Sequence, residues 1–102
     1  MSAIQIPGEV SRLASLAAGV VREVLGPSVR VLWYGSWVRG TAVPRSDVDL
    51  AVVAEGRVPT PTMALLRERI DDLPTLRKID LVDARAVSAA LRSRINEEGM
   101  AL

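Results

Sequence analysis

Residues 34–53 read YGSWVRGTAVPRSDVDLAVV, and this stretch decides how the rest of the chain is interpreted. It holds Gly35-Ser36 near its start and Asp47-Val48-Asp49 after a ten-residue gap. Apolar, β-branched and aromatic residues precede the glycine, and a second apolar run follows the acids, as is typical of two buried strands. The stretch therefore predicts a strand, a turn, a loop and a second strand, with polar groups at the end of one strand and the start of the next.

The flanking segments predict helices packed on these strands. Gly26-Pro27 ends an amphipathic first helix, and Asp83 is expected to be the N-cap of the last one. The order is typical of a small α+β domain, a mixed sheet with helices packed on it. The predicted elements are a helix over 8–25, a strand over 29–34, one helical turn within 35–40, a strand over 47–53, a helix over 62–73, a strand over 76–82 and a helix over 84–97.

Length and composition limit the possible functions. The 102 residues fit one domain, residues 1–102, and a formal net charge of +1 is too small for a general binder of phosphate backbones. We therefore expect no direct nucleic-acid binding. Met1 to Pro7 lack the regions of a signal peptide, and no apolar run approaches the ~20 residues of a membrane span, so a cytoplasmic location is expected.

The chain contains neither Cys nor His. Disulfides, thiolate chemistry and cysteine zinc sites are excluded, together with the commonest general base and metal ligand. Any catalysis must depend on carboxylates, Arg, Ser and backbone amides.

Asp47 and Asp49 are the first candidate pair. Residues two apart on a strand point to the same face, roughly 6.5–7 Å apart along it. This spacing lets two carboxylates share a pair of divalent ions about 3.5–4 Å apart. The alternative is that two acids at the start of a strand are simply solvated.

Gly35 and Ser36 are the second pair. A helical turn that opens after a strand offers free N–H groups to a phosphate, glycine allows close approach, and serine adds a hydroxyl. An ordinary strand-to-helix turn would look the same. Both pairs at this spacing would arise by chance in roughly one such chain in a thousand, so together they favour function.

A third carboxylate is expected on a neighbouring strand, where it would complete a metal site or accept a proton. Asp80 lies between apolar residues and faces away from them, on the same face as Lys78. Asp83 falls where the strand ends and suits a helix cap better. We choose Asp80, with an edge-strand charge paired to Lys78 as the structural alternative.

Arg39 and Arg45 flank the loop between the two pairs. Arginine binds phosphate oxygens bidentately, so either could hold a triphosphate or the departing pyrophosphate. Twelve Arg in the chain leave a surface role open for each, and of the two we choose Arg39 as the nucleotide-binding residue. Ser46 is expected to shape the loop, and Trp37 is either a rim anchor for a partner or base, or a core residue.

The order G-S-x-x-R-G over 35–40, S-D-x-D-L over 46–50 and I-D-L-V-D over 79–83 resembles the polymerase-beta-like nucleotidyltransferase superfamily. The small size is similar to that of its minimal nucleotidyltransferases, the antitoxin-type partners of HEPN-domain proteins. The specific match runs over 34–53, and looser agreement extends over 10–99. Val38 stands where Ala is common, which is a slight departure.

This resemblance implies the polymerase-beta-like fold and a set of roles. Gly35 and Ser36 would cradle the triphosphate, Asp47 and Asp49 would bind two Mg²⁺ ions, and Asp80 would be the third acid.

The implied reaction is Mg²⁺-dependent transfer of AMP from ATP to a hydroxyl on a protein partner. The partner would be a HEPN-domain toxin in a hetero-oligomer, with this chain as the antitoxin. Larger relatives carry extra domains for their acceptors. Two alternatives stay open: a non-catalytic antitoxin that masks its partner by binding, and a nucleotidyltransferase that acts on a small molecule or RNA.

Overall fold

The computed structural model describes residues 5–102, so part of the predicted absence of a signal peptide lies outside the described residues. The sheet has the strand order β3-β2-β1-β4, in which β2 and β3 are parallel and the other pairs antiparallel. The predicted α+β fold with a mixed sheet is confirmed. The elements are α1 (Gly8–Leu25), β1 (Arg30–Tyr34), α2 (Ser36–Arg39), β2 (Val48–Val53), α3 (Thr60–Asp71), β3 (Ile79–Asp83), α4 (Ala89–Glu98) and β4 (Met100–Ala101).

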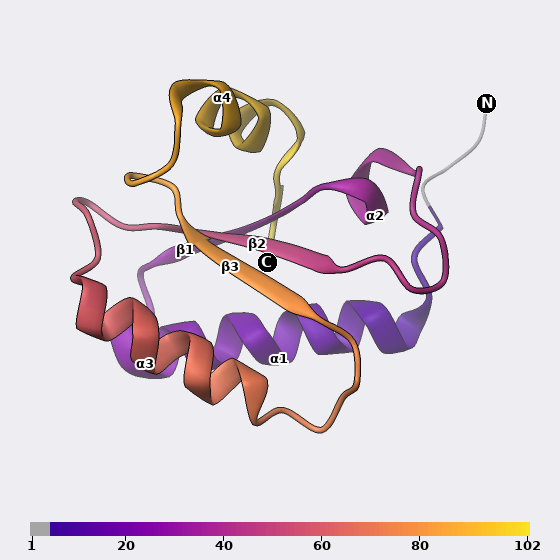
Figure 1. Ribbon diagram of the computed structural model, residues 1–102, viewed down its shortest axis with the longest axis horizontal. Coiled ribbons are helices and arrows are strands. Elements are labelled where there is room, and N and C mark those ends of the chain that lie inside the picture. The colour runs from indigo at the N-terminus through magenta and orange to yellow at the C-terminus, as the bar shows by residue number, and fades with distance from the viewer. Residues whose placement is uncertain (1–4) are drawn as a thin grey trace.

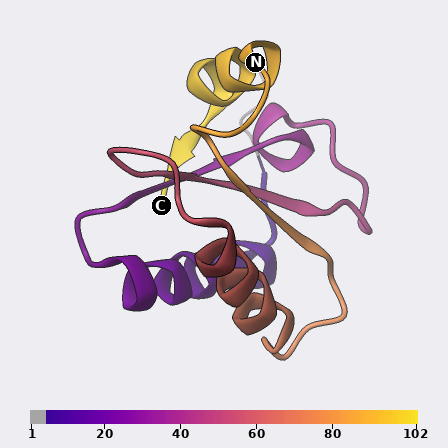
Figure 2. The same ribbon diagram turned by 60° about the vertical axis from the view of Figure 1, so that its left-hand side comes forward.

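Helices cover the two faces of the sheet unequally. Figures 1 and 2 show α1 and α3 side by side beneath one face, with α4 on the opposite face. Alternate strand residues point to opposite faces, so each strand divides its side chains between these two environments.

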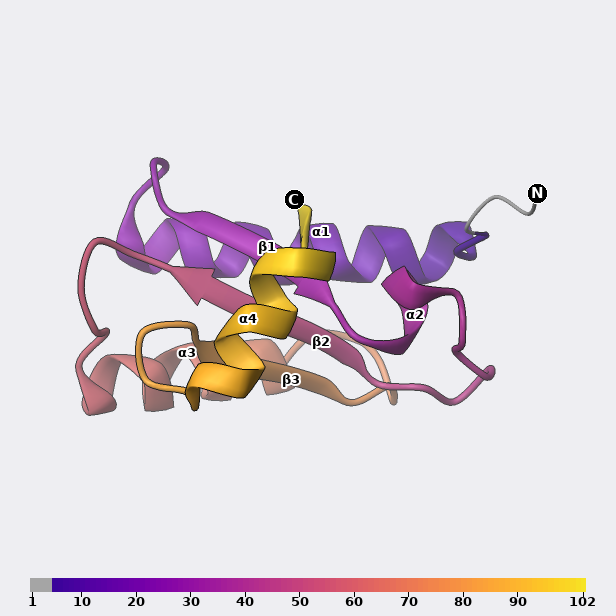
Figure 3. The same cartoon turned by 90° about the horizontal axis from the view of Figure 1, so that it is seen from above.

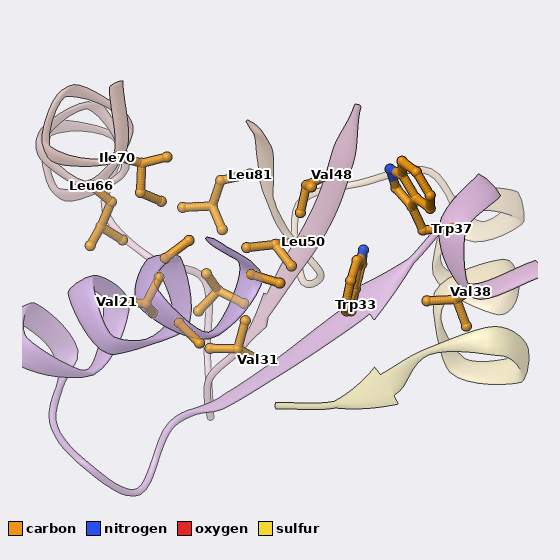
Figure 4. Close-up of a cluster of buried hydrophobic side chains, with 14 of the residues drawn as sticks. Val21, Val31, Trp33, Trp37, Val38, Val48, Leu50, Leu66, Ile70 and Leu81 are labelled. Carbon is orange, nitrogen blue, oxygen red and sulfur yellow. The ribbon is translucent and has the colours of Figure 1, made fainter. Parts of the chain in front are cut away.

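The face toward α1 and α3 carries the larger core. Figure 4 shows Leu50 and Leu81 from the sheet meeting Leu66 and Ile70 of α3 and Val21 of α1. All five side chains are at most 2% exposed. Aliphatic side chains supply most of this core, as the scarcity of aromatic residues predicts.

The other face has a smaller core under α4. Leu32 and Ala51 pack there against Ile95 of α4. Figure 3 shows the starts of β2 and β3 extending beyond α4 on the side of α2. This end of the face is therefore not covered by α4, and it holds the candidate site.

Most predicted boundaries hold within a few residues. α1 and its Gly26 C-cap are as predicted. α3 begins at Thr60, two residues early, because Pro61 in the first helical turn needs no N–H partner. β3 begins only at Ile79, since Leu76 is fully exposed and the side chain of Arg77 turns to the Pro44 and Ser46 carbonyls.

The last helix is present, but its predicted start and N-cap were wrong. α4 begins at Ala89 and is capped by Ser88, whose Oγ accepts the Leu91 N–H at 3.2 Å. Asp83 caps no helix: it is buried, and its two oxygens accept the N–H groups of Val58 at 2.7 Å and Arg85 at 2.9 Å. β4 was not predicted.

The outer edge of the sheet at β3 is covered by a side chain. Arg67 of α3 donates from Nε and Nη2 to the Leu81 carbonyl, at 3.2 and 3.0 Å.

Within residues 5–102, none of the helices has the length and apolarity needed to cross a membrane.

Candidate functional site

Three polar side chains form a row across the end of the sheet that α4 leaves uncovered, from the buried Tyr34 to the exposed Asp80. Asp49 is paired in register with Tyr34 on β1 and with Asp80 on β3. Side chains at paired positions share one face, with Cβ atoms about 5 Å apart. The predicted neighbourhood of Asp49 and Asp80 is therefore present.

Asp47 lies at one end of this row. β2 begins one residue later than predicted, at Val48, whose N–H donates to the Lys78 carbonyl at 3.0 Å. Asp47 is half-buried and close enough to Asp49 to raise the pKa of that carboxyl. All three predicted acids thus face one region.

The surroundings of Asp49 disfavour the ionised form of its carboxyl group. Its pKa rises from 3.8 to about 6, first because of burial and then because of the carboxylates of Asp80 and Asp47, while Arg39 and Lys78 lower it. Burial, followed by the carboxylates of Asp49, Asp80 and Glu98, also raises the pKa of the Tyr34 hydroxyl to about 12. Tyr34 therefore stays neutral and adds no charge at physiological pH.

The donor set fits a hard divalent cation. Clustered carboxylates with no sulfur or imidazole ligand suit Mg²⁺, and a cation would relieve the repulsion that raises the pKa of Asp49. In residues 5–102 no three acidic side chains already converge into a closed metal cage. Mg²⁺ normally keeps several water or phosphate ligands, so it does not need such a cage.

Gly35 brings the start of α2 against the carboxylates. Its φ of +88° favours glycine, and a Cβ at this position would overlap Oδ2 of Asp49. Ser36 is the first residue of α2, so the N–H groups of the first turn lack partners inside the helix. The predicted phosphate turn and the acids therefore lie in direct contact.

Glu98, at the end of α4, is a site residue that the sequence analysis missed. Its Oε1 accepts the Gly35 N–H at 3.0 Å and forms an ion pair with Arg39 Nη1 at 3.1 Å. No other ion pair forms within residues 5–102, so the Asp80–Lys78 pair considered above is absent there. The only local signal was the position of Glu98 before Gly99 at the end of the closing helix.

Basic side chains lie on the Asp47 side of the site. A hollow of about 520 Å³ opens beside Asp47, and Arg45 and Lys78 line it together with the exposed Leu76. Arg45 therefore lies near Asp47, in a hollow that Gly35 does not line.

Trp37 is a core residue and not a rim anchor. It is 7% exposed, and its Nε1 donates to the Ser46 carbonyl at 3.1 Å. The guanidinium of Arg77 stacks 5.4 Å from its ring centroid. Ser46 shapes the loop as predicted, since its Oγ accepts the Val43 N–H at 2.8 Å.

The sequence decides the family. Residues 27–102 match the family described as polymerase beta, nucleotidyltransferase, a range that includes the turn and all three acids. The chain belongs to this nucleotidyltransferase family. The family predicted from the motifs is thus confirmed.

Solved structures share the fold of this nucleotidyltransferase. One described as a minimal nucleotidyltransferase aligns with a TM-score of 0.68 at 26% identity, over 92% of this chain and 93% of the other. A toxin–antitoxin complex with AMP-PNP aligns with a TM-score of 0.71 at 24% identity, over 86% and 70%. A tri-AMPylated Shewanella oneidensis HEPN toxin in complex with MNT antitoxin gives 0.67 at 20% identity, over 89% and 69%. No curated protein matches the chain significantly.

Proposed function

We propose that this nucleotidyltransferase moves AMP from ATP to a hydroxyl on a protein partner and depends on Mg²⁺. The observation that carries the proposal is the contact between the Gly35-Ser36 turn and Asp49, which stands in register with Asp80. A phosphate-binding turn and a carboxylate group are the two parts that nucleotidyl transfer needs, and here they adjoin.

Each residue has a distinct role in this proposal. Ser36 holds the triphosphate through its backbone N–H and its hydroxyl, Gly35 lets the phosphate approach the turn closely, and Arg39 binds the phosphate oxygens from the same side. Asp47, Asp49 and Asp80 would hold two Mg²⁺ ions. When bound, the ions would favour the ionised acceptor oxygen and neutralise the charge that develops on pyrophosphate.

The transfer itself makes one bond and breaks another. The acceptor oxygen bonds to the α-phosphorus, the bond from that phosphorus to the bridging oxygen breaks, and pyrophosphate leaves. Asp80, the most exposed acid on the row, takes the acceptor proton.

A protein is the acceptor that the surroundings of the site favour. The hollow beside Asp47 is open, and it combines the cations Arg45 and Lys78 with the bare apolar side chain of Leu76. Such a rim suits a folded partner that presents its own hydroxyl. The structural neighbours that contain HEPN toxins, one of them tri-AMPylated, support a HEPN-domain partner, with this chain as its antitoxin.

The test uses the product of the neighbouring reading frame in the genome. The purified chain is incubated with Mg²⁺ and ATP labelled at the α-phosphate, with and without that product. We expect label on a Tyr, Ser or Thr of the partner, and none when Asp49→Asn replaces the wild type. A tight complex without transfer of label would favour the masking antitoxin, and label on RNA or a small molecule would replace the protein acceptor.

A further inference from the structure

Glu98 lies outside the motifs that predict chemistry, yet it contacts two of their residues. We propose that Glu98 is a positioning residue of the nucleotide site, which fixes the Gly35-Ser36 turn and holds Arg39 beside it for the triphosphate. This inference rests on the proposed function, because it takes Gly35, Ser36 and Arg39 as the nucleotide-binding residues. It adds the end of α4 to a site that the motifs place between β1 and β3.

The turn needs a partner for its backbone. Gly35 is buried, and a buried N–H without an acceptor is costly, so the bond of 3.0 Å to Glu98 Oε1 is a requirement of this conformation. Asp49 closes the other side of Gly35, where even a Cβ does not fit. The turn is therefore held between two carboxylates and has little room to move.

Arg39 needs a partner that leaves it available. One of its five N–H donors bonds Glu98 at 3.1 Å, and its side chain is 41% exposed, so the other donors can reach a phosphate. Arg39 also lies near enough to Asp49 to lower the pKa of that carboxyl. Without Glu98, the guanidinium would be drawn toward Asp49, one of the acids proposed to bind Mg²⁺.

The carboxylate of Glu98 is itself placed by well-packed neighbours. Ile95, one turn earlier, is fully buried, and its carbonyl accepts the Gly99 N–H at 2.8 Å. β4 follows immediately and pairs with Leu32 and Trp33 of β1. A residue held on both sides loses little entropy when it orients another group, which is what a positioning role requires.

Nucleotide binding tests the proposal without any acceptor. Isothermal titration calorimetry with Mg²⁺ and a non-hydrolysable ATP analogue compares Glu98→Ala, Glu98→Gln and, as the matched control, Glu97→Ala. Glu97 is the exposed neighbour in α4. We expect about tenfold weaker binding for Glu98→Ala, about threefold for Glu98→Gln, which keeps an acceptor oxygen but no charge, and less than twofold for Glu97→Ala.

A double-mutant cycle separates positioning from a purely structural role. If Glu98 acts through Arg39, Glu98→Ala should weaken binding at least threefold less in an Arg39→Ala background than in the wild type. In transfer assays, the KM for ATP should rise while kcat at saturation stays within about threefold.

Equal or tighter analogue binding by Glu98→Ala, or fully additive effects of the two changes, would overturn the proposal. Should Glu98→Ala not fold in a thermal melt, Glu98→Gln decides on the same criterion. A wild type that binds no analogue would instead refute the proposed function.

Discussion

The same strands build both faces of the sheet, but the two faces serve different purposes. On the face toward α1 and α3 the inward side chains are apolar, except for Asp83, whose two oxygens are both taken by backbone N–H groups. On the α4 face the same strands carry Asp49 and Asp80 in an uncovered row. A carboxylate on the sealed face therefore stabilises the fold, whereas one on the open face keeps its oxygens available for a ligand.

The largest expected effect tests the open face. Asp47→Asn and Asp49→Asn should each lower Mg²⁺-dependent transfer by at least about 100-fold, because each removes a charged ligand from a site without His or Cys. Thermal melts should show that both variants fold. Initial rates with labelled ATP provide the measurement, and activity within tenfold of wild type in either variant would remove the metal assignment.

Asp80 and Asp83 lie on the same strand, β3, but on opposite faces of the sheet, so substituting each in turn sharpens the comparison of the two faces. Asp80→Asn should cut the transfer rate strongly while nucleotide binding persists, since Asp47 and Asp49 remain. Asp83→Asn should leave the rate per folded molecule nearly unchanged but destabilise the fold by about 1–3 kcal/mol, because an amide can accept only one of its two N–H bonds. Urea unfolding and rates measured side by side decide the matter. The reverse pattern would assign the chemistry to the wrong face.

The smallest effect concerns stability and pH. The pKa of Asp49 is raised in the folded protein, from 3.8 to about 6, so this carboxyl stabilises the fold only when protonated, and that contribution is lost as the pH rises through about 6. Asp49→Asn should therefore gain about 1 kcal/mol over wild type at pH 8 without Mg²⁺, a figure reduced because the group is about half exposed.

Denaturant unfolding at a series of pH values tests this, with Asp47→Asn for comparison. The gain should vanish below about pH 3, where Asp49 is protonated in both the folded and unfolded states. A gain that is independent of pH would mean that ionisation of the buried Asp49 carboxyl is not its cause.

The sequence predicts those features that depend on neighbours along the chain. The C-terminal end of α1 was predicted because Gly26-Pro27 is a strong stop, and strand alternation was enough to place Asp80 on the same face as Asp49. Asp83 misled the prediction of the last helix, because a residue typical of an N-cap gives no sign that Val58, 25 residues earlier, already uses its oxygen. Glu98 was missed for the same reason, with 63 residues between it and Gly35.

The guanidinium of Arg67 on the Leu81 carbonyl has a consequence for how molecules of this protein meet each other. β3 is an outer strand, and an outer strand with free carbonyls invites pairing with a strand of another molecule. Arg67 donates two hydrogen bonds to the Leu81 carbonyl at the middle of that edge, and its guanidinium places a positive charge there. An approaching strand would have to displace this cation first, so growth of the sheet from one molecule into the next is blocked beside the proposed site.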